Sequence, residues 1–219
     1  MTISIAFSGA MFAWPYQAGV AAYVQDHGLL DAESRIYGTS SGSAVAMMLA
    51  MGLDIARVAF PVALDCNARA GWFRPSGVIP TYIAAFAPLL PIDAALRATG
   101  RLFVAITKLP LFRRTHVCEY GSGADVLDAL AGSMALPGIT VRVAHKSDRH
   151  GWCIDGGPVA NRDDRPGART IRVGVGPLPG DDIMPSRWIG LRERSQFASR
   201  ADRMAMFQLG YADARSQLA

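Results

Sequence analysis

The sequence predicts an α/β domain in which a mainly parallel sheet is covered by helices. Three observations support this class: short apolar segments alternate with helical ones, glycine-rich turns follow the first two strands, and the composition is globular. The chain has 219 residues, of which 51% are hydrophobic and 18% charged. It contains no internal repeat or low-complexity linker, so we expect residues 1–219 to form one domain.

The first strand is expected at Thr2–Phe7, where β-branched residues alternate with small ones and the pattern stops at Ser8-Gly9. Pro15 then suits the first turn of a helix, because the proline ring fixes a helical φ and the missing N–H has no partner there. The apolar stripe of this helix ends at His27-Gly28. A strand, a glycine-containing loop and a helix therefore begin the chain.

A second unit of the same kind follows. Residues 34–37 read as a short strand, Gly38–Gly42 as a tight turn, and Ser43–Met51 as an apolar helix rich in Ala and Met. Further strands are expected at 102–107, 115–118, 140–144, 152–155 and 170–175, and further helices at 122–130 and 194–217. Helices interleaved with short apolar strands favour a parallel sheet.

The longest apolar segment, residues 77–92, contains three prolines. It is too short to span a bilayer, and prolines inside a helix remove hydrogen bonds, so a continuous membrane helix is not expected. A buried connection is the simpler interpretation of this segment. A lid, an acyl-chain pocket or an interfacial patch is the alternative.

The N-terminal residues contain neither a basic stretch nor a long apolar run, so we expect no signal peptide and a cytoplasmic location. Cys66, Cys118 and Cys153 are odd in number and have no C-x-x-C spacing. This predicts reduced, buried thiols rather than disulfides or a zinc site. No metal-ligand spacing or nucleotide motif is present in the sequence, so no metal or cofactor is expected.

The charge balance is basic, with a formal net charge of +4 and a pI of about 9.2. The arginines are scattered and no nucleic-acid-binding motif accompanies them, so we expect no nucleic-acid partner. A solvated basic surface is the simpler interpretation, and peripheral contact with an anionic membrane surface is the alternative. The last helix places Phe197, Met204, Phe207 and Tyr211 roughly on one face. We interpret this face as packing against the sheet, and a helix that lies on a membrane surface is the alternative.

The turn Gly38-Thr39-Ser40-Ser41-Gly42 matches G-x-S-x-G between a strand and a helix. Such a nucleophile elbow lifts the serine hydroxyl clear of the sheet, and it needs glycine at 38 and 42 because side chains there would collide. The helix that follows offers N–H groups and partial positive charge to a developing anion. The alternative is that Ser40 or Ser41 caps this helix.

A serine nucleophile needs a base within hydrogen-bond reach. The chain contains four histidines, His27, His116, His145 and His150. None follows position 150, which disfavours the Ser-acid-His order of α/β-hydrolases, although a triad with His145 or His150 stays open.

A carboxylate is the second possibility for the base. Asp155 ends an apolar strand and precedes Gly156 and Gly157, which let the chain turn beside another backbone. A half-buried aspartate there would stay ionised and accept the Ser40 proton directly. A simple turn is the alternative interpretation of Asp-Gly-Gly.

Together these motifs resemble the patatin-like phospholipase family, whose members use a Ser-Asp dyad. Phe7–Val20 resembles the family's oxyanion loop and first helix, particularly in its adipose-lipase-like form, and Gly38–Gly42 resembles its elbow. Ser133–Gly138 resembles the family's A-S-x-A-x-P-x segment, and Asp155–Gly157 its D-G-G/A motif. The four motifs occur in the family's order between about residues 3 and 160.

The resemblance implies a three-layer α/β/α fold and cleavage of fatty-acyl esters through an acyl-enzyme. It implies that Ser40 is the nucleophile, Asp155 the base, and the loop Gly9-Ala10-Met11 the source of oxyanion-hole N–H groups. Phospholipid, lysophospholipid, acylglycerol and acyl thioester all remain possible substrates.

The oxyanion loop departs from the family pattern. Where the family has consecutive glycines, this chain has Ala10 and Met11 after Gly9. A positive φ at either position would be strained, because a side chain disfavours that conformation. A second hypothesis is therefore a catalytically weak or inactive patatin-fold protein that binds lipid or a partner.

Overall fold

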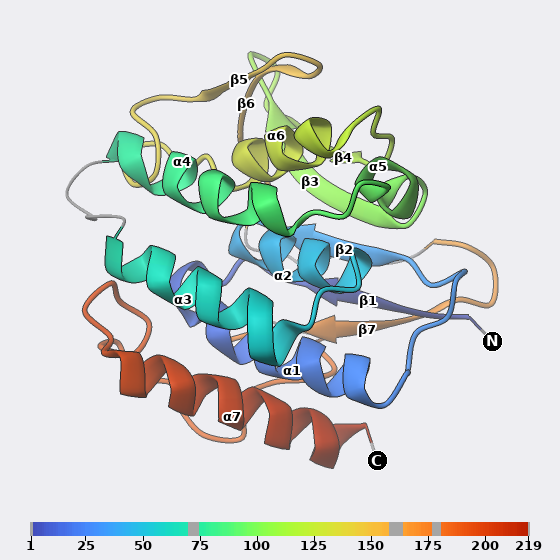
Figure 1. Ribbon diagram of the computed structural model, residues 1–219, viewed down its shortest axis with the longest axis vertical. Helices are drawn as coiled ribbons and strands as arrows, with labels where there is room; N and C mark the ends of the chain where they lie inside the picture. The colour runs from blue at the N-terminus through green and yellow to red at the C-terminus, as the bar shows by residue number, and fades with distance from the viewer. Residues whose placement is uncertain (1, 70–74, 158–163, 177–180, 219) are drawn as a thin grey trace.

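The computed structural model describes residues 2–69, 75–157, 164–176 and 181–218. Figure 1 shows a twisted sheet with helices packed over it and over one another. The strands are β1 (Ile3–Phe7), β2 (Ile36–Thr39), β3 (Leu102–Lys108), β4 (Arg113–Val117), β5 (His145–Ser147), β6 (Gly151–Asp155) and β7 (Arg169–Val173). The helices are α1 (Trp14–Asp26), α2 (Ser41–Ala50), α3 (Phe60–Arg69), α4 (Pro75–Phe86), α5 (Ala94–Ala98), α6 (Gly123–Ser133) and α7 (Arg200–Gln217). Shorter helical turns are η1 (Met11–Ala13), η2 (Ile55–Ala59) and η3 (Ala87–Leu89).

The centre of the sheet is parallel, with strand order β3-β2-β1-β7. β1 is buried from Ser4 to Phe7 and β2 along its whole length, so both faces of the sheet centre are covered. Parallel strands occur almost only where both faces are shielded in this way. The predicted α/β class with a parallel core is confirmed.

The antiparallel pairs lie at one edge of the sheet and determine where β6 ends. β4 pairs with β3 from Val104 to Lys108. On its other edge, β3 pairs with β2 up to Ala105 and with β6 from Ile106 onward. Because a strand has only two edges, β6 continues the line of β2, and the end of β2 meets the end of β6.

The last helix packs on the first, with which it makes an unusually close crossing (Figure 1). A Cβ atom added to Gly19 of α1 would lie 2.0 Å from the carbonyl oxygen of Phe207, so no side chain fits there. Phe207 also stacks on Phe60 of α3, with ring centroids 4.4 Å apart. The last helix is a packing helix as predicted, but it packs on α1 instead of on the sheet, and Phe197 and Met204 are exposed.

Two predicted elements are wrong. Residues 140–144 form a turn instead of a strand, because the Thr140 hydroxyl donates to the Met134 carbonyl oxygen and accepts the N–H of Leu136. The last helix begins at Arg200 instead of 194, because Ser199 and Asp202 form a capping box that starts it there.

The apolar segment 77–92 contributes most of α4, which continues through Pro80. Beside the proline, the Thr81 hydroxyl donates to the carbonyl oxygen of Gly77 over 2.7 Å. In the described part of the chain, no helix combines the length and the apolar character that crossing a bilayer requires. The predicted thiols are confirmed: Cys66 and Cys153 are buried, Cys118 is half-buried, and none forms a disulfide.

Candidate active site

Ser40 lies in a strained turn between β2 and α2. Its backbone has φ 54° and ψ −132°, a left-handed conformation that costs a residue with a side chain roughly 1–3 kcal/mol. The flanking glycines permit the turn, since a Cβ on Gly38 would lie 2.4 Å from the Ser43 Cα, and one on Gly42 would lie 2.4 Å from the Ser8 carbonyl oxygen. The Ser40 hydroxyl caps no helix N–H, so the capping interpretation of this residue is wrong.

Two serines hold this turn in place. The N–H of Ser40 donates to the Oγ of Ser133 over 2.9 Å, and the Oγ of Ser43 donates to the Ser40 carbonyl oxygen over 2.6 Å. Ser133 ends α6 and is fully buried. Both polar groups of the Ser40 backbone are therefore satisfied, and its side chain is left to face the site.

Asp155 lies at the point where β6 meets β2. It pairs with Ile106 of β3, while Thr39, just before Ser40, pairs with the adjacent Ala105. The N–H of Asp155 donates to the Ala135 carbonyl oxygen over 2.9 Å, and the Thr107 hydroxyl donates to the carbonyl oxygen of Asp155 over 2.8 Å. Register along β3 thus places the two residues side by side, although they are far apart in the sequence.

The carboxyl of Asp155 is held toward Ser40. Its Oδ1 accepts the N–H of Gly157 over 2.7 Å, and its Oδ2 is buried without a partner at full hydrogen-bond geometry among the described residues. Burial raises the pKa of this carboxyl, while hydrogen bonding to Ser40 and Gly157 and the nearby Arg114 guanidinium oppose the rise. The Ser40 hydroxyl is therefore close enough to this carboxyl to favour its ionised form.

The two glycines after Asp155 have separate roles. A Cβ on Gly156 would lie 2.4 Å from the carbonyl oxygen of Ala105, so β6 approaches β3 too closely there for any side chain. Gly157 has a φ of 89°, a conformation that glycine adopts without strain. This turn points the Gly157 N–H at the Asp155 carboxylate. Asp-Gly-Gly therefore forms a turn, and the turn also holds the Asp155 side chain in place.

The predicted oxyanion loop, Gly9-Ala10-Met11, links β1 to η1 and faces the elbow. The N–H of Ala10 donates to the Oγ of Ser41 over 3.2 Å, which places a loop amide beside the elbow. Met11 has a φ of 47° and is 46% exposed. The loop therefore contains a strained positive φ, at the methionine.

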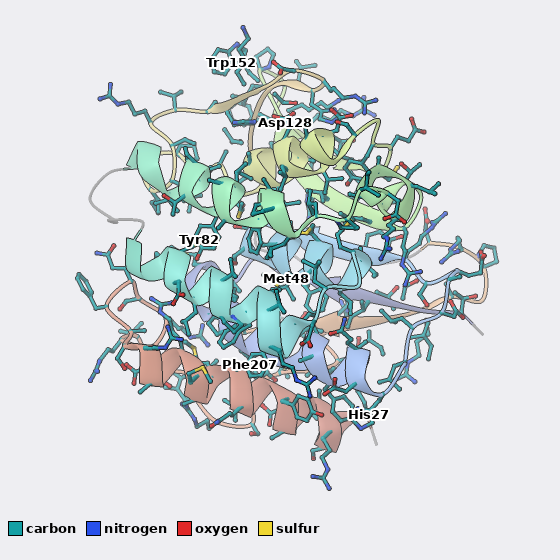
Figure 2. All side chains as sticks on the ribbon, viewed as in Figure 1. His27, Met48, Tyr82, Asp128, Trp152 and Phe207 are labelled. Carbon is teal, nitrogen blue, oxygen red and sulfur yellow. The ribbon has the colours of Figure 1, made fainter. Side chains whose placement is uncertain are left out.

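A narrow apolar cavity of about 70 Å³ opens beside Ser40. Its walls come from η1, α1, α2, α3, α4 and the segment after α6, and they include Met11, Trp14, Met48, Ala63, Tyr82 and Ile139. Figure 2 labels Met48 on α2 and Tyr82, which lies where α3 and α4 face each other. Val78 and Ile79 of α4 also line the cavity, so the apolar segment 77–92 contributes to the wall of the space beside Ser40.

A larger cavity of about 620 Å³ adjoins the first, between α4 and α6. Ile79 and Thr140 line both spaces. Asp128 and His145 line the larger space alone, with their side chains 2.8 Å apart. The two cavities are therefore neighbours that share a wall.

The histidines are engaged elsewhere. His145 Nε2 lies 2.8 Å from Asp128 Oδ1, whose Oδ2 accepts the Ser147 hydroxyl over 2.6 Å. The rings of His27 and His116 contact Tyr23 and Tyr37. Within the described ranges, no histidine hydrogen-bonds Ser40 or Asp155, and no cluster of three or more His, Cys, Asp or Glu side chains suits a metal ion.

Three supporting residues were not identified from the sequence. Ser133 holds the Ser40 N–H, Thr107 holds the Asp155 carbonyl oxygen, and Arg114 places a positive charge near the Asp155 carboxyl. Ser133 lies in a segment that resembles a family motif, so the sequence indicated that this segment matters. It did not indicate that the Ser133 hydroxyl binds the Ser40 N–H. Thr107 and Arg114 lie in ordinary strand sequence and carried no signal.

Comparison with known proteins gives a consistent family assignment. The patatin-like phospholipase family profile matches residues 5–163. Omega-hydroxyceramide transacylase of Mus musculus is 29% identical over 141 residues, which are 61% of this chain and 24% of that protein. Patatin-like phospholipase domain-containing protein 2 of Rattus norvegicus is 26% identical over 141 residues, which are 61% of this chain and 30% of that protein.

Among solved structures, VipD from Legionella pneumophila matches with a TM-score of 0.56 at 12% identity, over 99% of this chain and 66% of that one. This likeness concerns the fold and confirms the three-layer α/β/α arrangement expected from the resemblance. The region shared with the two curated relatives is less than a third of their length. Because the family profile covers most of the chain, the protein belongs to the patatin-like phospholipase family.

Proposed function

We propose that the protein is a serine acyl hydrolase that cleaves fatty-acyl esters of lipids through a Ser40-Asp155 dyad and an acyl-enzyme. The observation that carries this proposal is the meeting of a strained Ser40 with a half-buried Asp155 at the ends of β2 and β6. Phospholipase A, lysophospholipase and acylglycerol lipase activities all fit this arrangement. The family's lipid-acting members support the acyl-ester class of substrate.

In the first half of the proposed reaction, the Ser40 oxygen attacks the ester carbonyl carbon and its proton passes to Asp155. The raised pKa of the buried carboxyl makes it a stronger base than an exposed aspartate. The tetrahedral intermediate then breaks its bond to the alcohol, which takes the proton back from Asp155. The acyl group stays on Ser40 as an ester.

In the second half, Asp155 accepts a proton from water, and the resulting hydroxide attacks the acyl-enzyme carbonyl. Collapse of this second intermediate returns the proton to Ser40 and releases the fatty acid. The negative oxygen formed in both halves requires N–H donors, which the loop Gly9-Ala10-Met11 supplies in this proposal. The Ala10 N–H becomes available when the Ser41 hydroxyl turns away from it.

The test of the dyad is covalent labelling with a fluorophosphonate, followed by mass spectrometry of the labelled peptide. We expect an adduct on Ser40 in the wild type, none in Ser40→Ala, and much slower labelling of Asp155→Asn. The three proteins are also assayed on a series of phospholipid, lysophospholipid and acylglycerol esters in micelles. No Ser40 adduct and no turnover above the Ser40→Ala background would overturn the proposal.

A catalytically weak or inactive protein that binds lipid or a partner is the second candidate. The observation that favours it is the positive φ of Met11, with the Ala10 N–H already bound by Ser41. This candidate predicts that wild type and Ser40→Ala share one background rate while both bind acyl chains. A cytoplasmic location and the absence of a nucleic-acid partner remain predictions from the sequence.

A further inference from the structure

The antiparallel edge of the sheet extends beyond the end at which Ser40 lies. Thr39 pairs with Ala105, and β3 continues to Lys108 before its turn at 109–112. At about 3.3 Å per residue, this places the turn roughly 10 Å or more past the end of β2. The Leu109 N–H donates to the Trp152 carbonyl oxygen over 2.9 Å, so the start of β6 lies at the same projecting end.

Large apolar side chains are exposed along this projection. Leu111 is 84% exposed, Phe112 69% and Trp152 53%. We call these three residues the tip patch, and Figure 2 places Trp152 at one end of the molecule's long axis. Two further exposed apolar residues, Val143 (73%) and Ile139 (39%), lie in the segment that precedes β5, and Ile139 also lines the Ser40 cavity. Clustered exposed apolar groups of this size mark an interaction surface.

Cations without ion-pair partners surround the tip patch. Lys146 pairs directly across from Trp152 in the β5-β6 ladder, and Lys108 pairs with Arg113 where β3 turns into β4. Within the ranges that the structure describes, Lys108, Arg113, Arg142 and Lys146 form no ion pair. Asp148 is the exposed carboxylate nearest in sequence, so the surface is net positive.

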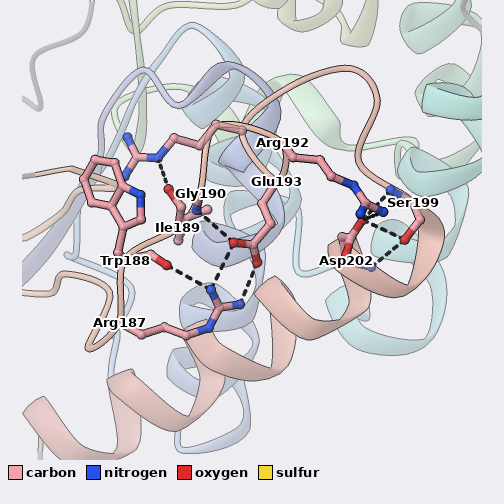
Figure 3. A network of polar contacts seen from close by, with 9 residues as sticks. Arg187, Trp188, Ile189, Gly190, Arg192, Glu193, Ser199 and Asp202 are labelled. Atoms are coloured by element: carbon pink, nitrogen blue, oxygen red, sulfur yellow. Dashed lines mark hydrogen bonds and ion pairs between the residues drawn. The ribbon is translucent and has the colours of Figure 1, made fainter.

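A second exposed apolar surface, at Trp188, Leu191 and Phe197, differs in its electrostatics. Figure 3 shows that Arg187 binds Glu193 over 2.7 Å and that Arg192 lies 3.3 Å from Asp202. Neighbouring Arg200 binds Asp65 over 2.8 Å, and the Arg194 guanidinium lies over the Trp188 ring. Carboxylates therefore neutralise most cations of this surface, and it has little attraction for an anionic partner.

We propose that the tip patch and its cations bind the protein to an anionic lipid bilayer and bring the Ser40 cavity to the membrane surface. Apolar side chains that enter the acyl region and cations that stay at the headgroups are the two features that interfacial binding requires. Tryptophan beside lysine, as at Trp152 and Lys146, suits the boundary between those regions. This inference rests on the proposed function for its purpose, but binding is measurable without catalysis.

The test is co-sedimentation of full-length Ser40→Ala protein with vesicles of phosphatidylcholine alone or with 30% phosphatidylglycerol. We expect binding to the anionic vesicles and at least tenfold weaker binding of Leu111→Ser/Phe112→Ser. Leu96→Ser is the matched apolar control, because Leu96 is 80% exposed on α5, which precedes β3 and lies at the opposite end of that strand. Circular dichroism and thermal unfolding establish that each variant is folded.

The charge contribution is tested separately. Arg113→Gln/Lys146→Gln is expected to weaken binding to anionic vesicles several-fold and to reduce its sensitivity to salt. Arg57→Gln/Arg215→Gln removes the same net charge from exposed sites on η2 and α7 and serves as the control. Equal losses in test and control variants would show a general charge effect and overturn the tip patch as the docking surface.

Two further results would also overturn the inference. One is that the wild-type protein fails to bind anionic vesicles. The other is a dimer in size-exclusion chromatography that Leu111→Ser/Phe112→Ser converts to monomer, because the tip patch would then be an interface between copies of the chain. Hydrolysis of a soluble short-chain ester, measured in the Ser40-containing versions of these variants, reports on the proposed function independently and is expected to stay unchanged.

Discussion

The backbone N–H of Ser40 donates a hydrogen bond of 2.9 Å to the Oγ of Ser133, a residue 93 positions later in the chain. Two residues after Ser133, the carbonyl oxygen of Ala135 accepts the N–H of Asp155 over 2.9 Å. The end of α6 and the turn that follows therefore contact both proposed catalytic residues. This segment connects the elbow to β6 and determines how Ser40 faces Asp155.

Ser133→Ala is expected to lower both activity and stability. The variant leaves the Ser40 N–H without its acceptor, which costs about 1–3 kcal/mol of unfolding free energy for a buried donor. A displaced nucleophile is expected to reduce kcat/KM roughly 10- to 100-fold. Chemical denaturation and ester turnover measure the two effects. Ser147→Ala, which removes another buried hydrogen-bonded serine, is expected to lose stability but keep its activity.

Asp155→Asn is expected to abolish the base while preserving the fold. Loss of general-base catalysis typically costs about 10²- to 10⁴-fold in rate. Because burial raises the pKa of Asp155, the folded state becomes less stable as pH rises through that pKa, and asparagine avoids this cost. We therefore expect an unfolding free energy at neutral pH no lower than that of the wild type.

Asp181→Asn is the matched control for this variant, because burial also raises the pKa of Asp181 and its Oδ2 has no partner among the described residues. Full activity of Asp181→Asn beside a slow Asp155→Asn identifies the base. A fully active Asp155→Asn would exclude the dyad. Steady-state kinetics on one ester and urea unfolding are sufficient for both variants.

The activity is expected to rise with pH through the pKa of Asp155, because this carboxyl must be ionised to accept a proton. The Arg114 guanidinium lowers that pKa. Arg114→Met is therefore expected to move the acidic limb of the kcat/KM profile to higher pH, and Arg114→Lys to restore part of the shift. A limb that stays in place in Arg114→Met would show that another group controls the profile.

Met11→Gly is expected to relieve strain in the oxyanion loop. A left-handed φ costs a residue with a side chain roughly 1–2 kcal/mol, and glycine's extra freedom in the unfolded state offsets roughly 0.5–1 kcal/mol of the gain. We expect a rise in kcat with a small gain in stability. Phe112→Gly is the matched control, because it relieves the same kind of positive-φ strain at a turn away from the elbow. Only the Met11 variant is expected to change turnover of a soluble ester.

His145→Ala and His150→Ala are expected to retain at least half of the wild-type kcat/KM. His145 binds Asp128 on α6, and the His150 N–H binds the Ser147 hydroxyl, so both histidines belong to the β5-β6 region. A loss of several orders of magnitude in either variant, with Asp155→Asn active, would support a conventional triad instead of the dyad.

Local sequence signals predicted the elements that build the sheet centre. The strand at Ile3–Phe7, the helix after Pro15 and the turn at Gly38–Gly42 depend on residues close to one another in the chain, so their patterns are visible in sequence. The turn at 140–144 was not predictable in this way. The Thr140 side chain reaches back to Met134 and Leu136, and this contact outweighs the strand preference of the β-branched residues.

By itself, the sequence determined the candidate pair Ser40 and Asp155, because G-x-S-x-G and Asp-Gly-Gly are local patterns whose glycines are required by backbone contact. The tertiary structure decided that the two residues meet, since their positions depend on β2 and β6 sharing one edge of β3. It also decided that Ser133 holds the Ser40 N–H and that Lys146, which forms no ion pair with the described residues, lies across from Trp152. These relationships depend on strand register and on side chains brought together across the fold, and neither is encoded in any short segment of the chain.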